Sequence, residues 1–345
     1  RQATICILSV IICVLLTADS RGTSDTVRRC IGTCLDSLIP SLFCFMAFAT
    51  LIIKTNIGEV TATPLWYISR YILRLDKKTF AVFILSQIGG YPVGVRLLSE
   101  LYGNDPDNSR SYSKHLCYCY NSGPAFVTGI VGIGVYNDVT AGIIVFISCL
   151  TANFLAAVVM NVRNTAFKPY RTEIGFSSSD ISASLISAAR AMLNIILPIL
   201  LFNCVTELAG YLLYAVFNME IPAFLKAVTE ITNIKTDGVI FSLPITSALI
   251  SFGGLCVIYQ IFSLADFKVN KLYFIFSRIL ISAVSAGVCC LILQITGYEP
   301  AADVFSYATD ILLTDPLLLI PVITAGQYAH RGSFVQLAGE DPAAQ

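Results

Sequence analysis

The chain has 345 residues, of which 56% are hydrophobic and 13% are charged, and its mean hydropathy is +0.75. Soluble domains carry about 25% charged residues because water must solvate their surface, so this composition excludes a water-exposed fold. Lys and Arg number 22, as do Asp and Glu, which leaves no net charge with which to hold nucleic acid. We therefore predict an all-α polytopic protein whose partner is the lipid bilayer.

The first elements in chain order are an apolar run at 3–18 and a charged segment at 19–37. No basic region precedes the apolar run, so we interpret it as an incomplete first membrane span and not as a cleaved signal peptide. The charged segment is expected to be amphipathic and to lie outside. Together these two segments form the first predicted unit, residues 1–37.

Four later runs are long enough to cross a hydrocarbon layer of about 30 Å as ordinary helices, at about 1.5 Å per residue. They are residues 38–53, 139–160, 191–217 and 273–296. We expect two interfacial helices between the spans, at 63–75 and 180–189. The segment SSSD at 177–180 should form the N-cap of the second of them, because Ser and Asp side chains accept hydrogen bonds from the free N–H groups of a first turn.

Four other apolar stretches contain Gly, Pro or amide residues near their middle. They are residues 79–98, 114–135, 220–245 and 246–262. A break at membrane depth frees backbone N–H and C=O groups that lipid cannot satisfy, so it survives only against protein or a watery cavity. These interruptions therefore predict the position of the functional site.

The order of elements suggests an internal repeat. A hairpin-like segment, a broken span and a long helix occur in residues 38–160, and the same order recurs in 180–296. We predict two inverted repeats, each with a re-entrant hairpin and a broken transmembrane helix. A cytoplasmic linker at 161–179 joins them, and 297–345 holds an outer loop, a last short span at 316–329 and a polar tail.

Loop charges favour this arrangement, because Lys and Arg accumulate in short cytoplasmic loops. If both hairpins re-enter, four basic segments fall on one side of the membrane: 70–78, 96–114, 163–171 and 268–271. The outer turn at 136–138 and the loop at 297–315 carry no Lys or Arg. The segment 19–37 disagrees, since Arg21, Arg28 and Arg29 would lie outside.

The interruptions read GGYP at 89–92, NSGP at 121–124, EITN at 230–233 and SFGG at 251–254. Together with Gln260 they resemble the sporulation integral membrane protein YlbJ family, over roughly residues 35 to 296. That family carries nucleoside-recognition Gate domains, which are similar to the core of concentrative nucleoside transporters. The resemblance implies a multi-pass protein in the cell membrane of a sporulating bacterium, with a transporter-like fold and an unassigned solute.

Glu230 is the principal candidate site residue. An ionised group near mid-membrane costs at least a few kcal/mol, so it must face a partner or a wet cavity; the alternative places it at a hairpin end among the headgroups. Thr232 and Asn233 add a hydroxyl and an amide. Asn121 and Ser122 precede Pro124, which should open a half-helix with free N–H groups directed at the solute, although a simple proline kink is the alternative.

The other candidates have equally clear structural alternatives. Gly90, Tyr91 and Gly254 suit ligand contact or close approach of crossing helices, and Gln87 and Gln260 either line the cavity or join helices. The complete substrate-binding prediction is Gln87, Gly90, Tyr91, Asn121, Ser122, Glu230, Thr232, Asn233, Gly254 and Gln260.

Three charged residues within the apolar stretches give further predictions. Glu207 and Glu230 are the candidates for coupling to H⁺ or Na⁺, with a contact from Glu207 to Asn203 or Thr206 as the alternative for Glu207. Arg278 is expected to snorkel from a span end to the headgroups.

No enzyme chemistry is indicated. Most of the twelve cysteines lie in apolar runs, where the thiol behaves as a small hydrophobe, and the chain has no Walker, HExxH or GxSxG motif. We expect no catalytic residue, metal or cofactor. The prediction is a secondary transporter or channel for a small polar or nucleoside-like solute. The alternative is a transporter-derived structural or assembly protein needed for spore formation, and either form could be a homo-oligomer.

Overall fold

A computed structural model describes residue 10 and residues 13–17, 19–102, 109–163, 175–238 and 240–299, and every regular element in this part of the chain is helical. The predicted all-α class is thereby confirmed. The predicted last span at 316–329 lies outside the described residues, as does most of the apolar run at 3–18.

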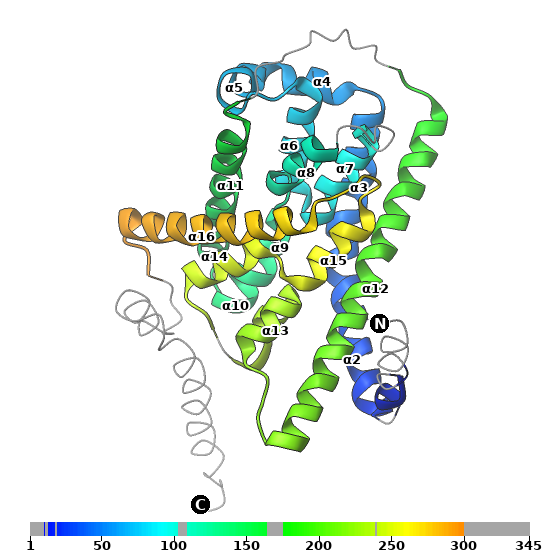
Figure 1. Ribbon diagram of the computed structural model, residues 1–345, viewed down its shortest axis with the longest axis vertical. Coiled ribbons are helices and arrows are strands. Elements are labelled where there is room, and N and C mark those ends of the chain that lie inside the picture. The colour runs from blue at the N-terminus through cyan, green and yellow to red at the C-terminus, as the bar shows by residue number, and fades with distance from the viewer. Residues whose placement is uncertain are drawn as a thin grey trace, which may run out of the picture.

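Four helical stretches are long and apolar enough to cross a membrane: Val139–Asn161 (α11), Ser178–Phe217 (α12), Leu243–Leu264 (α14 with α15) and Lys271–Thr296 (α16). The predicted run at 38–53 forms α3, Ile39–Lys54, which has only 16 residues. Figure 1 shows α11 and α12 along the long axis of the molecule and α16 across it. These four stretches support the prediction of a membrane protein.

Helix α12 corrects one prediction. The expected interfacial helix at 180–189 and the span at 191–217 are a single helix of 40 residues, because Arg190 lies on its exposed face and interrupts nothing. The predicted cap is confirmed, since Ser177 and Asp180 form a capping box. A helix of this length extends about 60 Å, so α12 reaches beyond a hydrocarbon layer of about 30 Å.

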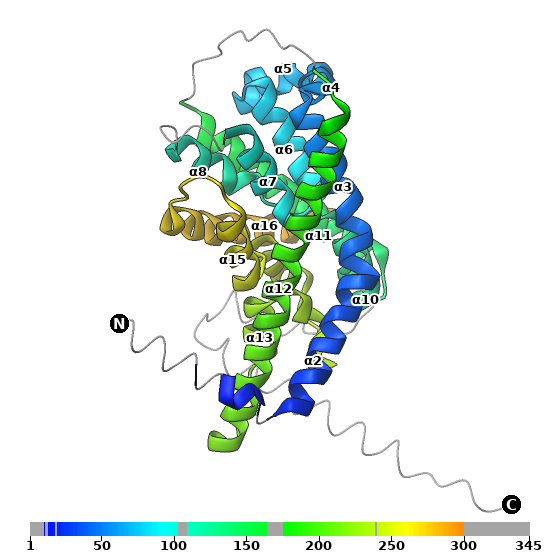
Figure 2. The ribbon, with the colours of Figure 1, turned by 90° about the vertical axis from the view of Figure 1, so that its right-hand side faces the viewer.

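The N-terminal elements form a nearly continuous helical rod that packs along α12 (Figure 2). It consists of α2 (Ser20–Thr33), the π-helical turn η1 (Cys34–Leu38) and α3. Short helical turns follow: α4 (Ile57–Ala62), η2 (Thr63–Leu65), α5 (Trp66–Ile68) and η3 (Ser69–Leu73). These turns cover the segment that was predicted as the first interfacial helix.

All four predicted interruptions are present. Gly90 (φ 89°) separates α6 (Lys77–Gly89) from α7 (Tyr91–Tyr102), and Gly253 (φ 84°) separates α14 (Leu243–Phe252) from α15 (Gly254–Leu264). Both φ values lie in the region that glycine adopts without a steric penalty. Non-helical residues 119–123 divide α8 (Ser109–Tyr118) from the helix at 124–136, and Glu230 divides α13 (Ala223–Thr229) from η6 (Ile231–Gly238). The helix at 124–136 comprises α9 (Pro124–Phe126), η5 (Val127–Ile133) and α10 (Gly134–Tyr136).

Hydrogen bonds collect the basic segments at one end of the helices. Arg74 donates to the Val162 carbonyl, Arg96 to Asp266 at 3.2 Å, and Ser113 to the Lys268 carbonyl at 3.3 Å. At another end, the Tyr298 hydroxyl donates to Asp138. The grouping of 70–78, 96–114 and 268–271 agrees with the prediction from loop charges.

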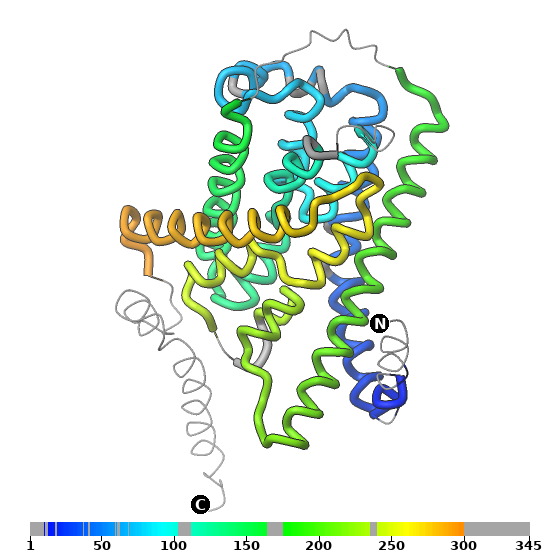
Figure 3. The backbone as a smooth tube through the Cα atoms, in the orientation of Figure 1, coloured from blue at the N-terminus to red at the C-terminus, as the bar shows by residue number. Residues whose placement is uncertain are grey.

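The two halves of the chain interleave in the middle of the molecule. Figure 3 shows segments from the first half, in cyan to green, beside segments from the second half, in yellow to orange. Helix α16 packs on α11 and α8, and α15 packs on α7. This interleaving brings the interruptions together.

Candidate functional site

The four interruptions meet at one place. A Cβ atom added to Gly90 would lie 3.5 Å from the Gly123 nitrogen, and one added to Gly254 would lie 3.2 Å from the Val228 carbonyl oxygen. The Tyr120 hydroxyl donates to the Phe252 carbonyl at 2.8 Å, which joins the break after α8 to the break after α14. Residues far apart in the sequence therefore form one junction.

An inner cavity of about 210 Å³ lies at this junction. Six of the ten predicted substrate-binding residues line it: Gly90, Tyr91, Ser122, Glu230, Thr232 and Gln260. The interruptions at Gly90 and Glu230 thus face the same space. The volume is below the roughly 300–1,000 Å³ of pockets for drug-sized ligands, so the inner cavity suits a small solute or one part of a larger one.

Three polar atoms at the junction are buried without a hydrogen-bond partner in the described structure. They are Asn121 Oδ1, Ser122 Oγ and Glu230 Oε2, and each of these residues is 1% exposed. Leaving a buried polar atom unsatisfied costs about 1–3 kcal/mol, and native proteins keep few of them. Three in one junction indicate a place where a solute or water completes the bonding.

Glu230 owes its position to the end of α13. Its backbone is extended (φ −144°, ψ 118°), which turns the chain out of the helix and points the residue into the junction. One carboxylate oxygen accepts from the Thr232 N–H at 3.2 Å, and the other has no partner. The Cys256 thiol, on α15, interacts with the same carboxyl group. Glu230 is therefore buried inside the protein, as a residue facing a partner or a cavity would be.

The segment after Asn121 opens a helix toward the same space. Gly123 is the N-cap of the helix at 124–136 and Pro124 is its first residue, as predicted. Pro has no N–H to leave unsatisfied, and its fixed φ suits a first turn. Ser122, Gly123 and Pro124 all line the inner cavity, so the positive end of this helix faces it.

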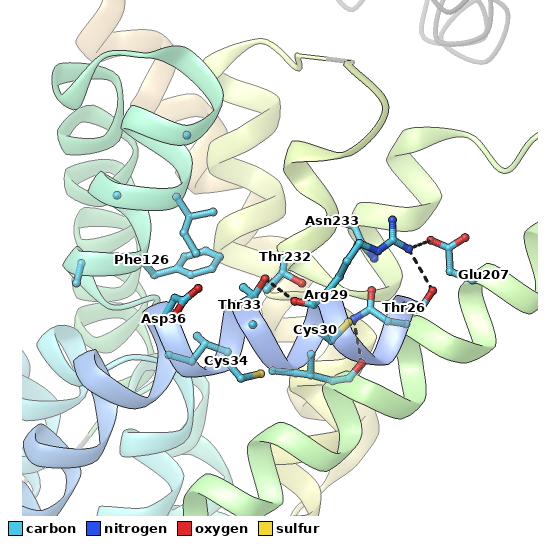
Figure 4. A pocket seen from close by; sticks show the side chains of 18 residues that line it. Thr26, Arg29, Cys30, Thr33, Cys34, Asp36, Phe126, Glu207, Thr232 and Asn233 are labelled. Atoms are coloured by element: carbon cyan, nitrogen blue, oxygen red, sulfur yellow. Dashed lines mark hydrogen bonds and ion pairs between the residues drawn. The ribbon is translucent and has the colours of Figure 1, made fainter. Parts of the chain in front are cut away.

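A second and larger space, the vestibule, adjoins the inner cavity. Its volume is about 810 Å³, and it shares Leu38, Ala125, Phe126, Ile199 and Thr232 with the inner cavity. Figure 4 shows Phe126, Asp36 and Thr232 around this space, with α2 and η1 forming one wall. Asn233 lines the vestibule, whereas Gln87, Asn121 and Gly254 line neither space.

Glu207 lies at the outer part of the vestibule, not beside Glu230. It pairs with Arg29 at 3.3 Å, and the two side chains are 54% and 69% exposed. The alternative contacts do not form, because Asn203 donates to the Ile199 carbonyl and Thr206 to Thr229. An exposed pair of this kind contributes about 0–1 kcal/mol to stability.

Two of the predicted residues have side-chain amides that join helices. Gln87 donates to the Tyr118 carbonyl at 3.0 Å and accepts from Asn153 at 3.3 Å. Gln260 donates to the Ile195 carbonyl at 3.1 Å. Gln87 is thereby used in helix contacts, while Gln260 also lines the inner cavity.

Arg278 overturns the expectation that it snorkels. It is 0% exposed and donates to the Cys117 carbonyl and to Asn153 Oδ1, each at 2.9 Å, and to the carbonyl and hydroxyl of Ser251. Its guanidinium lies over the Tyr120 ring, 4.4 Å from the ring centre. Cys117 and Ser251 belong to the last turns of α8 and α14, so Arg278 supplies donors and positive charge to two negative helix ends.

The described residues contain no group of three His, Cys, Asp or Glu side chains placed to hold a metal ion. No protein-family model, curated protein or solved structure matches the chain.

Proposed function

We propose that this chain is a secondary transporter or channel for a small polar solute, which binds in the inner cavity. The observation that carries the proposal is the meeting of four helix interruptions around three buried polar atoms without partners. Interruptions of this kind are tolerated at membrane depth where they line a cavity, and transporters use them to bind solutes and ions.

The order of the interrupted elements supports two inverted repeats. The series α6–α7, the broken pair ending at α10, and α11 corresponds to α13–η6, α14–α15 and α16. Re-entry of the first hairpin is supported by the hydrogen bond between Thr79, at the start of α6, and Tyr102, at the end of α7, because both ends then lie together. The basic segments gathered at one end agree with a cytoplasmic face.

The vestibule and the inner cavity would form the route for the solute. Phe126 and Thr232 line both spaces and so stand at the passage between them. Glu230, Ser122 and Thr232 would bind the solute in the inner cavity, and Asn121 would support Ser122 from the adjacent position. Glu230 and Glu207 remain the candidates for coupling to H⁺ or Na⁺.

The biological setting rests on the motifs. The interruptions at 89–92, 121–124, 230–233 and 251–254 resemble those of the YlbJ sporulation family. We propose on this ground that the protein belongs to the cell membrane of a sporulating bacterium. A nucleoside-like solute follows from that resemblance alone.

The test is uptake by purified protein in proteoliposomes, measured for a panel of small polar metabolites and compared with empty vesicles. Wild-type protein should take up at least one solute, and Glu230→Gln should abolish uptake while remaining folded. The exposed Glu299→Gln is the matched control and should retain uptake. Absence of uptake by folded wild-type protein across the panel would overturn the proposal.

A structural or assembly role is the second candidate, and the Arg278 network favours it. Arg278, Asn153 and Gln87 join α16, α11 and α6 to the ends of the half-helices, which is the bonding expected of a rigid scaffold. Under this role, Glu230→Gln would still support spore formation in cells, with membrane abundance measured alongside.

A further inference from the structure

The charge of the inner cavity has one sign. Among the described residues that line it, Glu230 is the only charged one, and no ion pair to Glu230 is found in that part of the chain. A buried carboxylate without a cationic partner is strongly unfavourable. A solute that brings a positive charge would supply the missing partner.

The shape of the Glu230 site leaves room for such a partner. The Thr232 N–H occupies one carboxylate oxygen at 3.2 Å, and the second oxygen is buried and has no hydrogen bond. The Ser122 hydroxyl, also without a partner, lines the same cavity. A cation placed between them could form an ion pair with the carboxylate, and a hydroxyl group on the same molecule could give Ser122 a hydrogen-bond partner.

The rest of the lining favours an organic cation over an inorganic one. Three aromatic residues, Phe45, Tyr91 and Phe126, line the inner cavity, and most of the other lining side chains are aliphatic. Inorganic cations are held by several oxygen ligands, whereas organic ammonium groups are attracted to aromatic ring faces. The few oxygens and three rings therefore match an ammonium group with alkyl substituents.

The vestibule has the same bias. Arg29 is turned to Glu207 and so is neutralised, while Asp36 lies nearer to Phe126 and has no ion pair in the described structure (Figure 4). The charged residues that line the vestibule, Arg29, Asp36 and Glu207, carry one net negative charge, which favours cations over anions in this space. The approach to the inner cavity is thus suited to cations.

We infer that the solute of the inner cavity is a small organic cation, whose ammonium group binds the Glu230 carboxylate and the rings of Phe45, Tyr91 and Phe126. The inference rests on the proposed function and specifies its substrate class. It concerns binding, so it can be measured apart from transport.

The experiment measures binding to purified full-length protein in detergent by isothermal titration and by the shift of the melting temperature. The probes are choline, its neutral isostere 3,3-dimethylbutan-1-ol, and NaCl at matched ionic strength. Choline should bind and raise the melting temperature, and the isostere should bind on the order of 100-fold more weakly, because it lacks the charge that a buried partner requires. Glu230→Gln should remove this preference, and Glu299→Gln should keep it.

Equal binding of choline and the isostere would overturn the inference, as would stabilisation by Na⁺ alone to the same extent or no binding of choline. Uptake of a neutral solute in proteoliposomes together with any of these results would leave the proposed function standing. Choline binding without any uptake would instead sustain the inference and contradict transport.

Discussion

Arg278 on α16 donates a 2.9 Å hydrogen bond to the side-chain oxygen of Asn153 on α11. The amide of Asn153 in turn donates to the Tyr120 carbonyl at 2.9 Å and to Gln87 at 3.3 Å. One continuous network therefore connects the two long helices to α6 and to the interrupted segment before Pro124. The network holds the positions of the half-helix ends that surround the inner cavity.

We predict that Arg278→Met destabilises the protein by about 3–5 kcal/mol. Met retains much of the side-chain length but leaves the Cys117 and Ser251 carbonyls without their donor, inside a region with no access to water. The measurement is thermal or denaturant unfolding in detergent. An unchanged midpoint would show that the network adds nothing to stability.

Two variants separate charge from geometry in this prediction. Arg278→Lys keeps the charge but cannot reach both carbonyls with one nitrogen, so its loss should fall between those of wild type and Arg278→Met. Arg190→Met removes an exposed arginine from α12 and should change stability by no more than about 0.5 kcal/mol.

We predict that Gly253→Ala destabilises the protein by more than about 2 kcal/mol. Gly253 has a φ of 84°, and an added Cβ would lie 1.9 Å from the Tyr120 hydroxyl, so the residue would face both backbone strain and a clash. Gly287→Ala is the control. Nothing lies within 4 Å of a Cβ at that position of α16, and alanine favours a helix, so stability should be kept or raised. Equal effects of the two substitutions would contradict the prediction.

The interruptions could be predicted from the sequence because their signals are local. Gly, Pro and amide residues within an apolar run indicate a break in the helix whatever the tertiary structure around it. All four predicted interruptions lie where these residues indicated. The signal for the N-cap within residues 177–180 was equally local. The boundary between two helices at Arg190 was predicted wrongly. The charged residue was interpreted as the end of a helix, although the exposed face of a single helix can hold an arginine.

The role of Arg278 could not be predicted, because it depends on long-range contacts. Its acceptors lie 161 residues away at Cys117 and 27 residues away at Ser251, and nothing in the sequence states that those helix ends meet. The sequence did offer one signal for burial, because Arg278 lies inside the apolar run of α16 and not at its first residue. The vestibule could not be predicted for the same reason. Arg29 and Glu207, which both line it, are 178 residues apart in the sequence.

Asp138 and Tyr298, which flank α11 and α16, give a prediction about pH. The Tyr298 hydroxyl donates to the Asp138 carboxylate and holds its pKa below the usual range, while burial and this bond raise the pKa of Tyr298 to about 12. The contact should therefore stabilise the protein at neutral pH, weaken as the pH falls below 3.8, the ordinary pKa of Asp, and weaken as Tyr298 ionises near pH 12.

The variant Tyr298→Phe tests this pair. Its melting temperature in detergent should be lower than that of wild type at pH 7, and the difference should shrink as the Asp138 carboxylate is protonated. Thr140 donates its N–H to Asp138 at 2.7 Å in both proteins and is therefore common to the comparison. If the difference in melting temperature between the two proteins stays constant from neutral to acidic pH, the lost stability comes from the contact area of the hydroxyl and not from its bond to the carboxylate.

Asn121→Ala tests whether both halves of the chain contribute to one site. The Asn121 amide donates to the Gln87 carbonyl at 3.3 Å, but its oxygen is buried without a partner, so removing the side chain relieves one orphaned atom while losing one weak bond. The free energy of unfolding should therefore change by no more than about 1 kcal/mol. Uptake in proteoliposomes and complementation of spore formation should nevertheless be lost, because Asn121 belongs to the opposite half from Glu230 and the proposed site requires both. A folded Asn121→Ala protein that retains full uptake would show that the site does not require the Asn121 side chain.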